Sequence, residues 1–213
     1  MKLLVSFPNL KIIIEKPISI NDPINKELFF MFSSQLNLFI SRPWNFSKLW
    51  LQFKENIEIS GEIKSLFIKH SGEILRDYIN PPQDWLHHDI CLIQELNLNF
   101  SPHNPLNKII WSNNHKNLSI NIEDGPNIEI EGGFSAERIS IFEVFLKNGS
   151  KLKMDMNNRN FLIQASDGKT ETIDASDDLP VNSMVEQFIN TEINETNRNN
   201  ELKILQKLQI LSI

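Results

Sequence analysis

Alternating apolar and polar positions dominate the second half of the chain and predict β-strands. Residues 118–122 and 128–130 carry Ile or Leu at every second position, and the segment 124–127, Asp-Gly-Pro-Asn, separates them as a turn. A period of two places successive side chains on opposite faces, which is the pattern of a half-buried antiparallel hairpin. Residues 139–156 and 161–173 repeat the pattern. The spacing therefore predicts a six-stranded antiparallel meander with one solvated face.

One of these strands, residues 139–146, breaks the alternation. Ile139 and Ile141 point to one face, whereas Phe142 and Val144 point to the other, so both faces carry apolar groups. The pattern fits either a central strand that is covered on both sides or a strand shifted in phase by a bulge near Glu143. In both cases we expect another element to pack on the second face.

Two amphipathic segments at the end of the chain predict helices that could supply this cover. Apolar residues at helical spacing occupy residues 181–193, and Pro180 stands near the first turn, where its missing N–H costs little. The polar tract 194–200 is typical of a linker, and Leu residues within 202–211 predict a short last helix. A helix of this length is marginal in isolation, so it must pack on its own sheet, on a partner or on a second copy. Self-association through residues 201–213 is one of these alternatives.

The first half combines short strands with helices and holds 13 of the 19 aromatic residues, counted up to residue 100. Alternation predicts strands at residues 10–14 and 96–100. Apolar residues at helical spacing predict helices within residues 24–36, 46–53 and 63–75.

Together these patterns predict an α+β fold, with N-terminal helices and short strands followed by a C-terminal antiparallel β-meander with closing helices. We divide the chain into a mixed aromatic-rich region (1–105), an antiparallel sheet region (106–178) and C-terminal helices (179–213). All three could belong to one domain, because 213 residues can bury a sizeable core without a disulfide or a metal.

The charge is unevenly distributed, although the net charge is only −6. Residues 1–116 hold 12 basic and 11 acidic groups, whereas residues 117–213 hold 9 basic and 16 acidic groups. Affinity for nucleic acid depends on Lys and Arg that neutralise phosphates, so the acidic half argues against nucleic acid as the main ligand. It favours a basic protein as the partner.

A docking surface for such a partner can be placed on the sequence. The acidic residues lie on or beside the solvent face of the first predicted hairpin, and two tryptophans stand next to polar residues, where they could serve as exposed anchors. The candidate partner-binding residues are Glu123, Asp124, Glu129, Glu131, Trp44 and Trp111.

The histidines suggest an alternative chemistry. His87, His88 and Asp89 are consecutive, and His70 precedes them. An imidazole and a carboxylate can bind one divalent cation, as in the metal-dependent phosphohydrolases of the HD type, and either His87 or His88 could also act as a general acid or base. The alternative function is therefore a metal-dependent hydrolase.

Other catalytic motifs are incomplete. Gly132-Gly133 lacks the third glycine and the following helix of a dinucleotide-binding fingerprint, and Ser166–Thr170 lacks the leading glycine of a phosphate-binding loop. Cys91, the single cysteine, lies in an apolar run that is typical of a buried, inert thiol. We therefore expect no cofactor and no metal, and the sequence favours a non-enzyme over an enzyme.

The leading functional hypothesis is a non-catalytic protein-binding module, such as an immunity protein, an antitoxin or an adaptor or assembly subunit. The lone cysteine fits a reducing compartment, and the chain contains no apolar run long enough to cross a bilayer. We expect a cytoplasmic protein that does not bind membranes.

Overall fold

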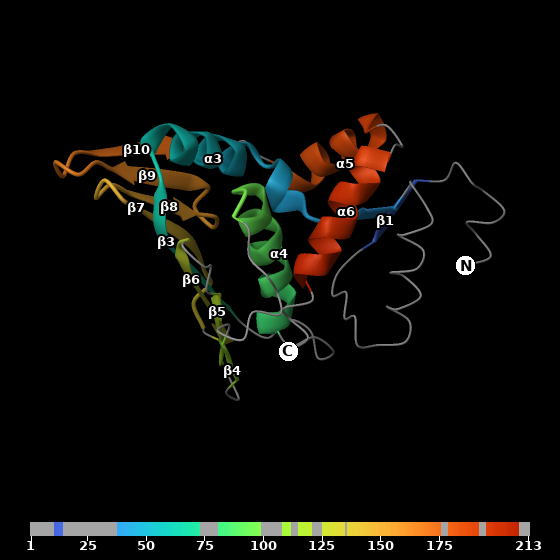
Figure 1. Ribbon diagram of the computed structural model, residues 1–213, viewed down its shortest axis with the longest axis horizontal. Helices are drawn as coiled ribbons and strands as arrows, with labels where there is room; N and C mark the ends of the chain where they lie inside the picture. Colours follow the sequence, from blue (N-terminus) through green and yellow to red (C-terminus); the bar gives the residue numbers. More distant parts are fainter. Residues whose placement is uncertain are drawn as a thin grey trace.

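The computed structural model describes residues 11–14, 38–72, 81–98, 108–111, 115–120, 125–134, 136–175, 179–191 and 195–208. The strands in these ranges are β1 (Ile12–Ile14), β2 (Leu38–Ile40), β3 (Ile63–Gly72), β4 (Lys108–Trp111), β5 (His115–Ile120), β6 (Asn127–Phe134), β7 (Ile139–Leu146), β8 (Lys151–Asp155), β9 (Asn160–Gln164) and β10 (Thr170–Asp174). The helices are the 3-10 helix η1 (Pro43–Phe46) and the α-helices α3 (Lys48–Ser60), α4 (Pro81–Glu95), α5 (Pro180–Asn190) and α6 (Glu195–Leu208). The predicted mixture of helices and strands is confirmed (Figure 1). The helix predicted within 24–36 lies outside the described residues.

Eight strands form one sheet, in the order β10-β9-β8-β7-β3-β6-β5-β4. All neighbours are antiparallel except β3 and β6, which run parallel. The three predicted hairpins are present as β5–β6, β7–β8 and β9–β10. The predicted continuous meander is wrong, because β3 lies between β6 and β7 and pairs with both.

β3 stands where the sequence predicted a helix within residues 63–75. Leu66, Ile68 and His70 are buried on one face of the strand, and Phe67 is half-buried on the other. Three consecutive apolar residues are compatible with either a helical or a strand period. The pairing partners, which lie far away in the sequence, decide between the two, because a strand with neighbours on both sides has all its backbone groups bonded.

Aromatic residues of α3 pack on one face of the sheet. Ser47 caps the helix, since its Oγ accepts a 3.0 Å hydrogen bond from the backbone N–H of Trp50. The rings of Trp50 and Phe53 meet Phe142 of β7 edge-on, with centroids 5.4 and 5.9 Å apart, and Phe53 meets Phe161 of β9 at 5.6 Å. All four rings are buried, so this cluster fixes α3 on the sheet.

The bulge considered near Glu143 is absent. β7 pairs with β8 without interruption from Ile141 to Phe145. The irregularity in this part of the sheet lies instead in β3, between Ile63 and Ser65. β7 is a central strand with regular alternation, and its two faces differ in how deeply they are buried.

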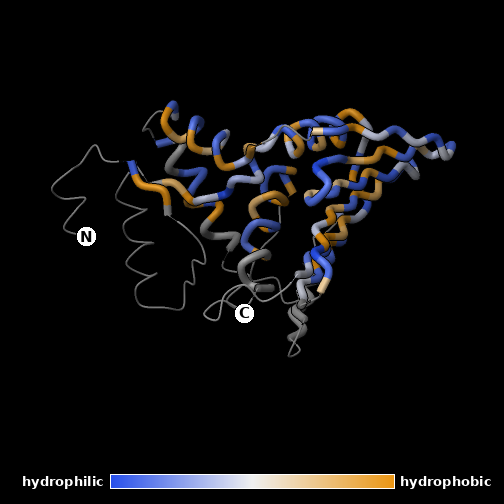
Figure 2. Tube along the Cα trace, turned by 180° about the vertical axis from the view of Figure 1, so that it is seen from behind, coloured by the Kyte–Doolittle hydropathy of each residue, from blue (hydrophilic) through white to orange (hydrophobic). Residues whose placement is uncertain are grey.

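The predicted closing helices do not cover the second face of the sheet. α5 contacts η1, and α6 contacts α4 and β2, so both lie beyond α4 when viewed from the sheet (Figure 1). Residues of α3, α4, β3, β6 and β7 share one apolar core. Hydrophobic and hydrophilic residues alternate along the strands of the sheet (Figure 2). Within the described part of the chain, the helices therefore cover one face and leave the other half-exposed.

The last two helices are present, but the second begins earlier than predicted. α5 confirms the helix expected at 181–193, whereas the expected linker, 194–200, is helical from Glu195 onward. An acidic residue in the first turn is favourable at the positive end of the helix dipole. The buried Glu201 then ties this helix to the rest of the molecule. No helix in the described residues is long and apolar enough to span a bilayer.

Lys11, directly before β1, caps the C-terminal end of α5. Its Nζ donates hydrogen bonds to the carbonyl oxygens of Phe188, Ile189 and Thr191, at 3.2, 2.7 and 2.8 Å. These carbonyls lack partners within the helix and carry partial negative charge, so a cation stabilises them. The contact fixes β1 and its parallel neighbour β2 beside the closing helices.

The first two regions of our sequence division contribute to one sheet. β3 from the region 1–105 pairs with β6 and β7 from the region 106–178. The helices of the region 179–213 contact β2, η1 and α4.

Candidate functional site

The helix α4 occupies the centre of the molecule, between the sheet and α6 (Figure 1). It contacts β6 and β3 on one side and η1 and α6 on the other. Because neighbours surround it, side chains around most of the helix are buried, among them Leu86, Ile90 and Leu92. Polar groups on this helix are therefore held in fixed positions.

Three polar residues connect α4 to the sheet. Asp89 Oδ1 on α4 lies 2.7 Å from His70 Nε2 on β3, and His70 Nδ1 lies 3.0 Å from Ser140 Oγ on β7. All three residues are less than one-tenth exposed. The sequence singled out His70 and Asp89 as metal ligands, and the structure does bring them together, as partners of each other.

A Ser-His-Asp arrangement invites comparison with a catalytic triad, in which histidine activates serine as a nucleophile. Here the Ser140 Oγ also contacts the sulfur of Met156, at 3.3 Å. None of the three residues lines the cavity beside Gly61 and Leu96 or the cavity between the end of α4 and α6. A nucleophile must be accessible to its substrate, so the geometry favours a bridge that holds α4 on the sheet.

The consecutive residues His87, His88 and Asp89 do not form a metal site in the structure. His87 is buried and His88 is half-buried on α4. Among the described residues, no group of three or more His, Cys, Asp or Glu side chains is arranged to hold a metal ion.

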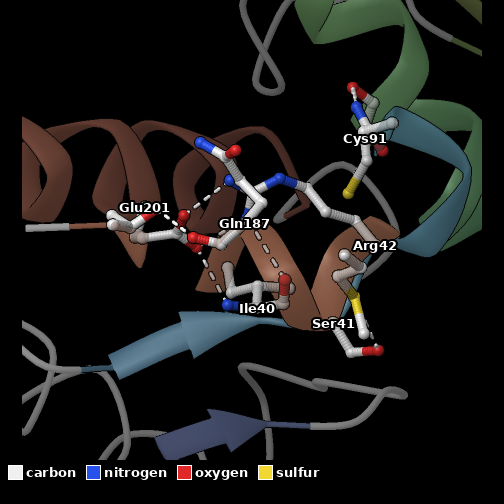
Figure 3. A network of polar contacts seen from close by, with 9 residues as sticks. Ile40, Ser41, Arg42, Cys91, Gln187 and Glu201 are labelled. Carbon is white, nitrogen blue, oxygen red and sulfur yellow. Dashed lines mark hydrogen bonds and ion pairs between the residues drawn. The ribbon is translucent and has the colours of Figure 1, made fainter. Parts of the chain in front are cut away.

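A second buried network joins β2 to α6 (Figure 3). Arg42 binds Glu201 through both terminal nitrogens, with Nη2–Oε1 at 2.7 Å and Nη1–Oε2 at 2.8 Å. The same Glu201 Oε2 accepts a 2.9 Å hydrogen bond from the backbone N–H of Ile40, and Arg42 Nη1 donates to the Ile40 carbonyl at 3.2 Å. The guanidinium also lies 4.4 Å from the ring centre of Phe39. Burial opposes the charge of Arg42, but the adjacent Glu201 outweighs it, and the pKa of Arg42 lies above its usual value.

This network lies at the carboxyl ends of two parallel strands. β1 and β2 run in the same direction, so Ile14 and Ile40 end at the same edge. From β2 the chain passes into η1, where Asn45 Nδ2 donates a buried 2.9 Å hydrogen bond to the Cys91 carbonyl of α4. His88 lies one helical turn before Cys91. The carboxyl ends of parallel strands are where α/β proteins bind ligands, so the edge beside α4 is the candidate site.

Arg42 and Glu201 were not found by sequence reasoning. Glu201 directly follows an Asn-rich tract that is typical of a linker, and no local pattern pairs it with a residue so far away in the chain. The available signal was weak: a single carboxylate at the start of an apolar helical stripe, and a single arginine directly after a strand. Both patterns occur often on exposed surfaces.

The residues predicted for partner binding are scattered. Trp44 is half-buried and packs against the core, so it is not an exposed anchor. Glu129 accepts a hydrogen bond from Asn127 at 3.2 Å, and Glu131 pairs with Lys69 at 3.1 Å on the half-exposed face of the sheet.

The side chains of the remaining three predicted partner-binding residues lie outside what the structure describes. Glu123 and Asp124 lie outside the described residues. Trp111 is the last residue of β4, and its side chain is likewise outside the description.

Comparison with known proteins gives a likeness in structure only. No known family's sequence profile and no curated protein sequence matches the chain. UDP-N-acetylglucosamine 3-dehydrogenase GnnA from Acidithiobacillus ferrooxidans is similar in fold, with a TM-score of 0.74 and 14% identity over 98% of this chain and 71% of that one. A Gfo/Idh/MocA family oxidoreductase from Vibrio cholerae gives 0.72 and 11%, over 98% and 71%. A mutant of the 3-ketoreductase KijD10 from Actinomadura kijaniata, in complex with TDP-benzene and NADP, gives 0.70 and 12%, over 95% and 68%.

The chain is therefore similar in fold to these dehydrogenases and reductases over nearly its whole length. This finding overturns both functions expected from the sequence. The prediction of a non-catalytic immunity protein, antitoxin or adaptor is wrong, because the three solved structures named above are dehydrogenases, oxidoreductases or reductases. The alternative, a metal-dependent hydrolase built on His87, His88 and Asp89, is wrong for the same reason. Acidity and missing motifs were a poor guide because neither reports on the fold.

The residues at the candidate site do not fit the pyrophosphate of a dinucleotide such as NADP. A phosphate cradle needs free backbone N–H groups in a glycine-rich turn. At the end of β2 the N–H of Ile40 is bonded to Glu201, and Pro43 has none. The sequence contains no Gly-x-Gly-x-x-Gly segment.

Proposed function

We propose that this chain binds a nucleotide-linked sugar, as the substrate-binding part of an oxidoreductase. The observation that carries this proposal is the similarity of nearly the whole chain to a UDP-N-acetylglucosamine 3-dehydrogenase and to a 3-ketoreductase whose structure contains TDP-benzene. Both ligands contain a nucleoside diphosphate. The substrate lies at the shared carboxyl edge of β1 and β2, against α4.

His88 is the proposed contact to the sugar. Of the three histidines whose burial is described, His70 and His87 are buried, whereas His88 is half-buried and can meet a ligand. When a sugar hydroxyl is oxidised to a carbonyl, its carbon loses a hydride to an acceptor that this edge of the chain does not hold, and its oxygen loses a proton, which imidazole is suited to accept near neutral pH. The proposed role of His88 is to orient that hydroxyl and take its proton.

Isothermal titration of the purified chain with UDP-N-acetylglucosamine tests the proposal. We expect saturable one-to-one binding, which His88→Gln weakens about tenfold, because a hydrogen bond to the sugar is lost. Lys153→Gln, a matched change of a side chain that is 41% exposed on the sheet, should leave binding unchanged.

Two results would contradict the proposal. One is a folded chain, verified by circular dichroism, that binds no nucleotide-linked sugar. The other is equal affinity for UDP-N-acetylglucosamine and for uridine, since the sugar and the diphosphate would then contribute nothing.

A further inference from the structure

The turn between β7 and β8 is fastened to the connection between α3 and β3 by three contacts. The backbone N–H of Lys147 donates a 2.9 Å hydrogen bond to the carbonyl of Glu62, and the side chains of these two residues form an ion pair. Asn148 Nδ2 donates a 2.8 Å hydrogen bond to the carbonyl of Ser60, the last residue of α3. We call these contacts the turn clasp. The elements that it joins, α3 and β7, lie on the other side of α4 from β1 and the proposed sugar site (Figure 1).

Asn148 is the one asparagine of the chain that a glycine follows. Gly149 has a φ of 89°, in the left-handed region that favours glycine, so the turn itself requires this residue. Because glycine has no Cβ, its backbone nitrogen is the least hindered one that can approach the side chain of a preceding asparagine. Asn148 is exposed, so water reaches its amide. An unhindered backbone nitrogen and access to water are the two conditions for loss of the side-chain amide nitrogen.

We propose that Asn148 is a site of spontaneous deamidation, and that the turn clasp limits its rate. The backbone nitrogen of Gly149 attacks Cγ of Asn148 and gives up its proton, and the side-chain nitrogen leaves as ammonia. Water then opens the resulting cyclic imide at one of its two carbonyl carbons. The product is aspartate, or isoaspartate when the chain continues through the former side chain. Water is the only co-reactant.

Both nitrogens of the reaction are held by hydrogen bonds in the folded chain. Asn148 Nδ2 donates to the carbonyl of Ser60, and the N–H of Gly149 donates to the carbonyl of Leu146 at 3.1 Å. The Oδ1 of Asn148 accepts a further bond, of 2.9 Å, from the N–H of Ser150. The side chain must leave these bonds before its Cγ can reach the Gly149 nitrogen. Deamidation therefore proceeds through local opening of the turn, which costs free energy.

The product weakens the clasp permanently. A carboxylate only accepts hydrogen bonds, so it has no hydrogen to donate to the carbonyl of Ser60. The new negative charge also joins that of Glu62 in the same clasp, where Lys147 is the cation. Isoaspartate in addition lengthens the main chain of the turn. The modification therefore loosens the hold of the β7–β8 turn on the end of α3.

Peptide mass spectrometry of the full chain, held folded or unfolded in guanidinium chloride at mildly alkaline pH, tests the proposal. Asn157 is the matched control. It is also exposed, and its Nδ2 also donates to a backbone carbonyl, that of Arg138 at 2.8 Å, but Asn158 follows it in place of a glycine. In the unfolded chain we expect nearly complete loss of the Asn148 amide at a time when the amide of Asn157 is still intact.

The folded chain tests the role of the clasp. We expect Asn148 to deamidate at least about tenfold more slowly in the folded chain than in the unfolded one, because several hydrogen bonds must open first. Equal rates at Asn148 and Asn157 in the unfolded chain would overturn the assignment of the site. Equal rates at Asn148 in the folded and the unfolded chain would overturn the role of the clasp.

Two glycine variants separate the clasp from global stability. Gly61 follows Ser60 and has a φ of 126°, so Gly61→Ala strains the connection that the clasp holds. We expect this variant to raise the ratio of the folded to the unfolded rate at Asn148 about fivefold or more. Gly168→Ala introduces comparable strain in the β9–β10 turn, where φ is 86°, and should leave the ratio unchanged. Equal effects of the two variants would mean that the clasp plays no local part.

Asn148→Asp reproduces the aspartate product and tests its effect on the clasp. Hydrogen exchange of the Lys147 N–H, measured by NMR, should be about tenfold faster in this variant than in the parent. Asn157→Asp, the same change at the control position, should leave this exchange rate unchanged. Equal exchange in the parent and in Asn148→Asp would overturn the loosening of the clasp. The modification does not involve the proposed sugar site, so binding of UDP-N-acetylglucosamine should be the same before and after deamidation.

Discussion

His70 on β3 and Asp89 on α4 are joined by a buried 2.7 Å contact that fixes the central helix on the central strand. The contact is one end of a chain of bonds that continues to Ser140 on β7. Asp89 is 1% exposed, so water cannot replace a lost partner. A hydrogen-bond network that is buried at this depth adds a polar contact to the apolar packing that holds α4 on the sheet.

Asp89→Ala should therefore destabilise the protein. We expect the free energy of unfolding in urea to fall by about 2 to 3 kcal/mol, because the buried Nε2 of His70 loses its contact with Asp89. Glu131→Ala, which removes the exposed partner of Lys69 on the same strand, is the matched control and should cost less than about 1 kcal/mol. Equal losses in the two variants would show that the buried contact contributes nothing special.

The Arg42–Glu201 pair should behave as a coupled unit. Glu201→Met leaves the Arg42 charge buried and unpaired, and we expect it to lower the unfolding free energy by about 3 to 5 kcal/mol. The double variant Arg42→Met and Glu201→Met leaves no unpaired charge and should cost much less than the sum of the single changes. A double-mutant cycle on unfolding free energies measures this coupling, and strict additivity would contradict it.

The two faces of β7 should respond differently to truncation. Phe142→Ala empties a site enclosed by Trp50 and Phe53, and we expect a loss of about 3 to 5 kcal/mol. Phe145→Ala, on the half-buried opposite face, should cost about 1 kcal/mol. Chemical denaturation of the two variants is the measurement, and the reverse order would mean that the second face is covered in solution.

The exposed pair of Glu62 and Lys147 should be visible in a titration. The ammonium of Lys147 bonds the Glu62 carboxylate and lowers its pKa below the usual value of a glutamate. Because the pKa of Glu62 is lower in the folded state than in the unfolded state, the pair stabilises the fold at pH values above the usual glutamate pKa. This stabilisation is lost as the pH falls through the lowered pKa of the folded state. Carboxyl NMR should show this midpoint, and Lys147→Gln should move it upward. An unchanged midpoint would mean that Lys147 does not interact with Glu62 in solution.

The parts of the fold that the sequence predicted are those fixed by neighbouring residues. The hairpins β7–β8 and β9–β10 follow from alternation and from turns a few residues long, and α5 follows from its apolar stripe. β3 could not be predicted, because its three successive apolar residues fit both a helical and a strand period. Its partners in β6 and β7 lie many residues away in the sequence. Long-range pairing is the information that a local pattern lacks.

The same distinction holds for the candidate site. The sequence grouped His70 and Asp89 as candidate ligands of one metal ion, and in the structure the two side chains contact each other instead. The predicted role as metal ligands was wrong. A direct hydrogen bond between two side chains uses the same residue types as shared coordination of a metal ion, so the sequence could not distinguish the two. Arg42 and Glu201 were missed because each is ordinary in its local context, and only the contact between β2 and α6 makes them notable.

The parallel pairing of β3 with β6 has a consequence for the order of folding. β3 ends at Gly72 and β6 begins at Asn127, so the chain passes through α4, β4 and β5 before it returns to pair beside β3. The hairpins on either side can form from local contacts, whereas β3 must close long loops before it pairs. Until it docks, β6 and β7 each present an open strand edge, which is a template for pairing with another chain. Aggregation during refolding should therefore depend on how fast this one strand is inserted.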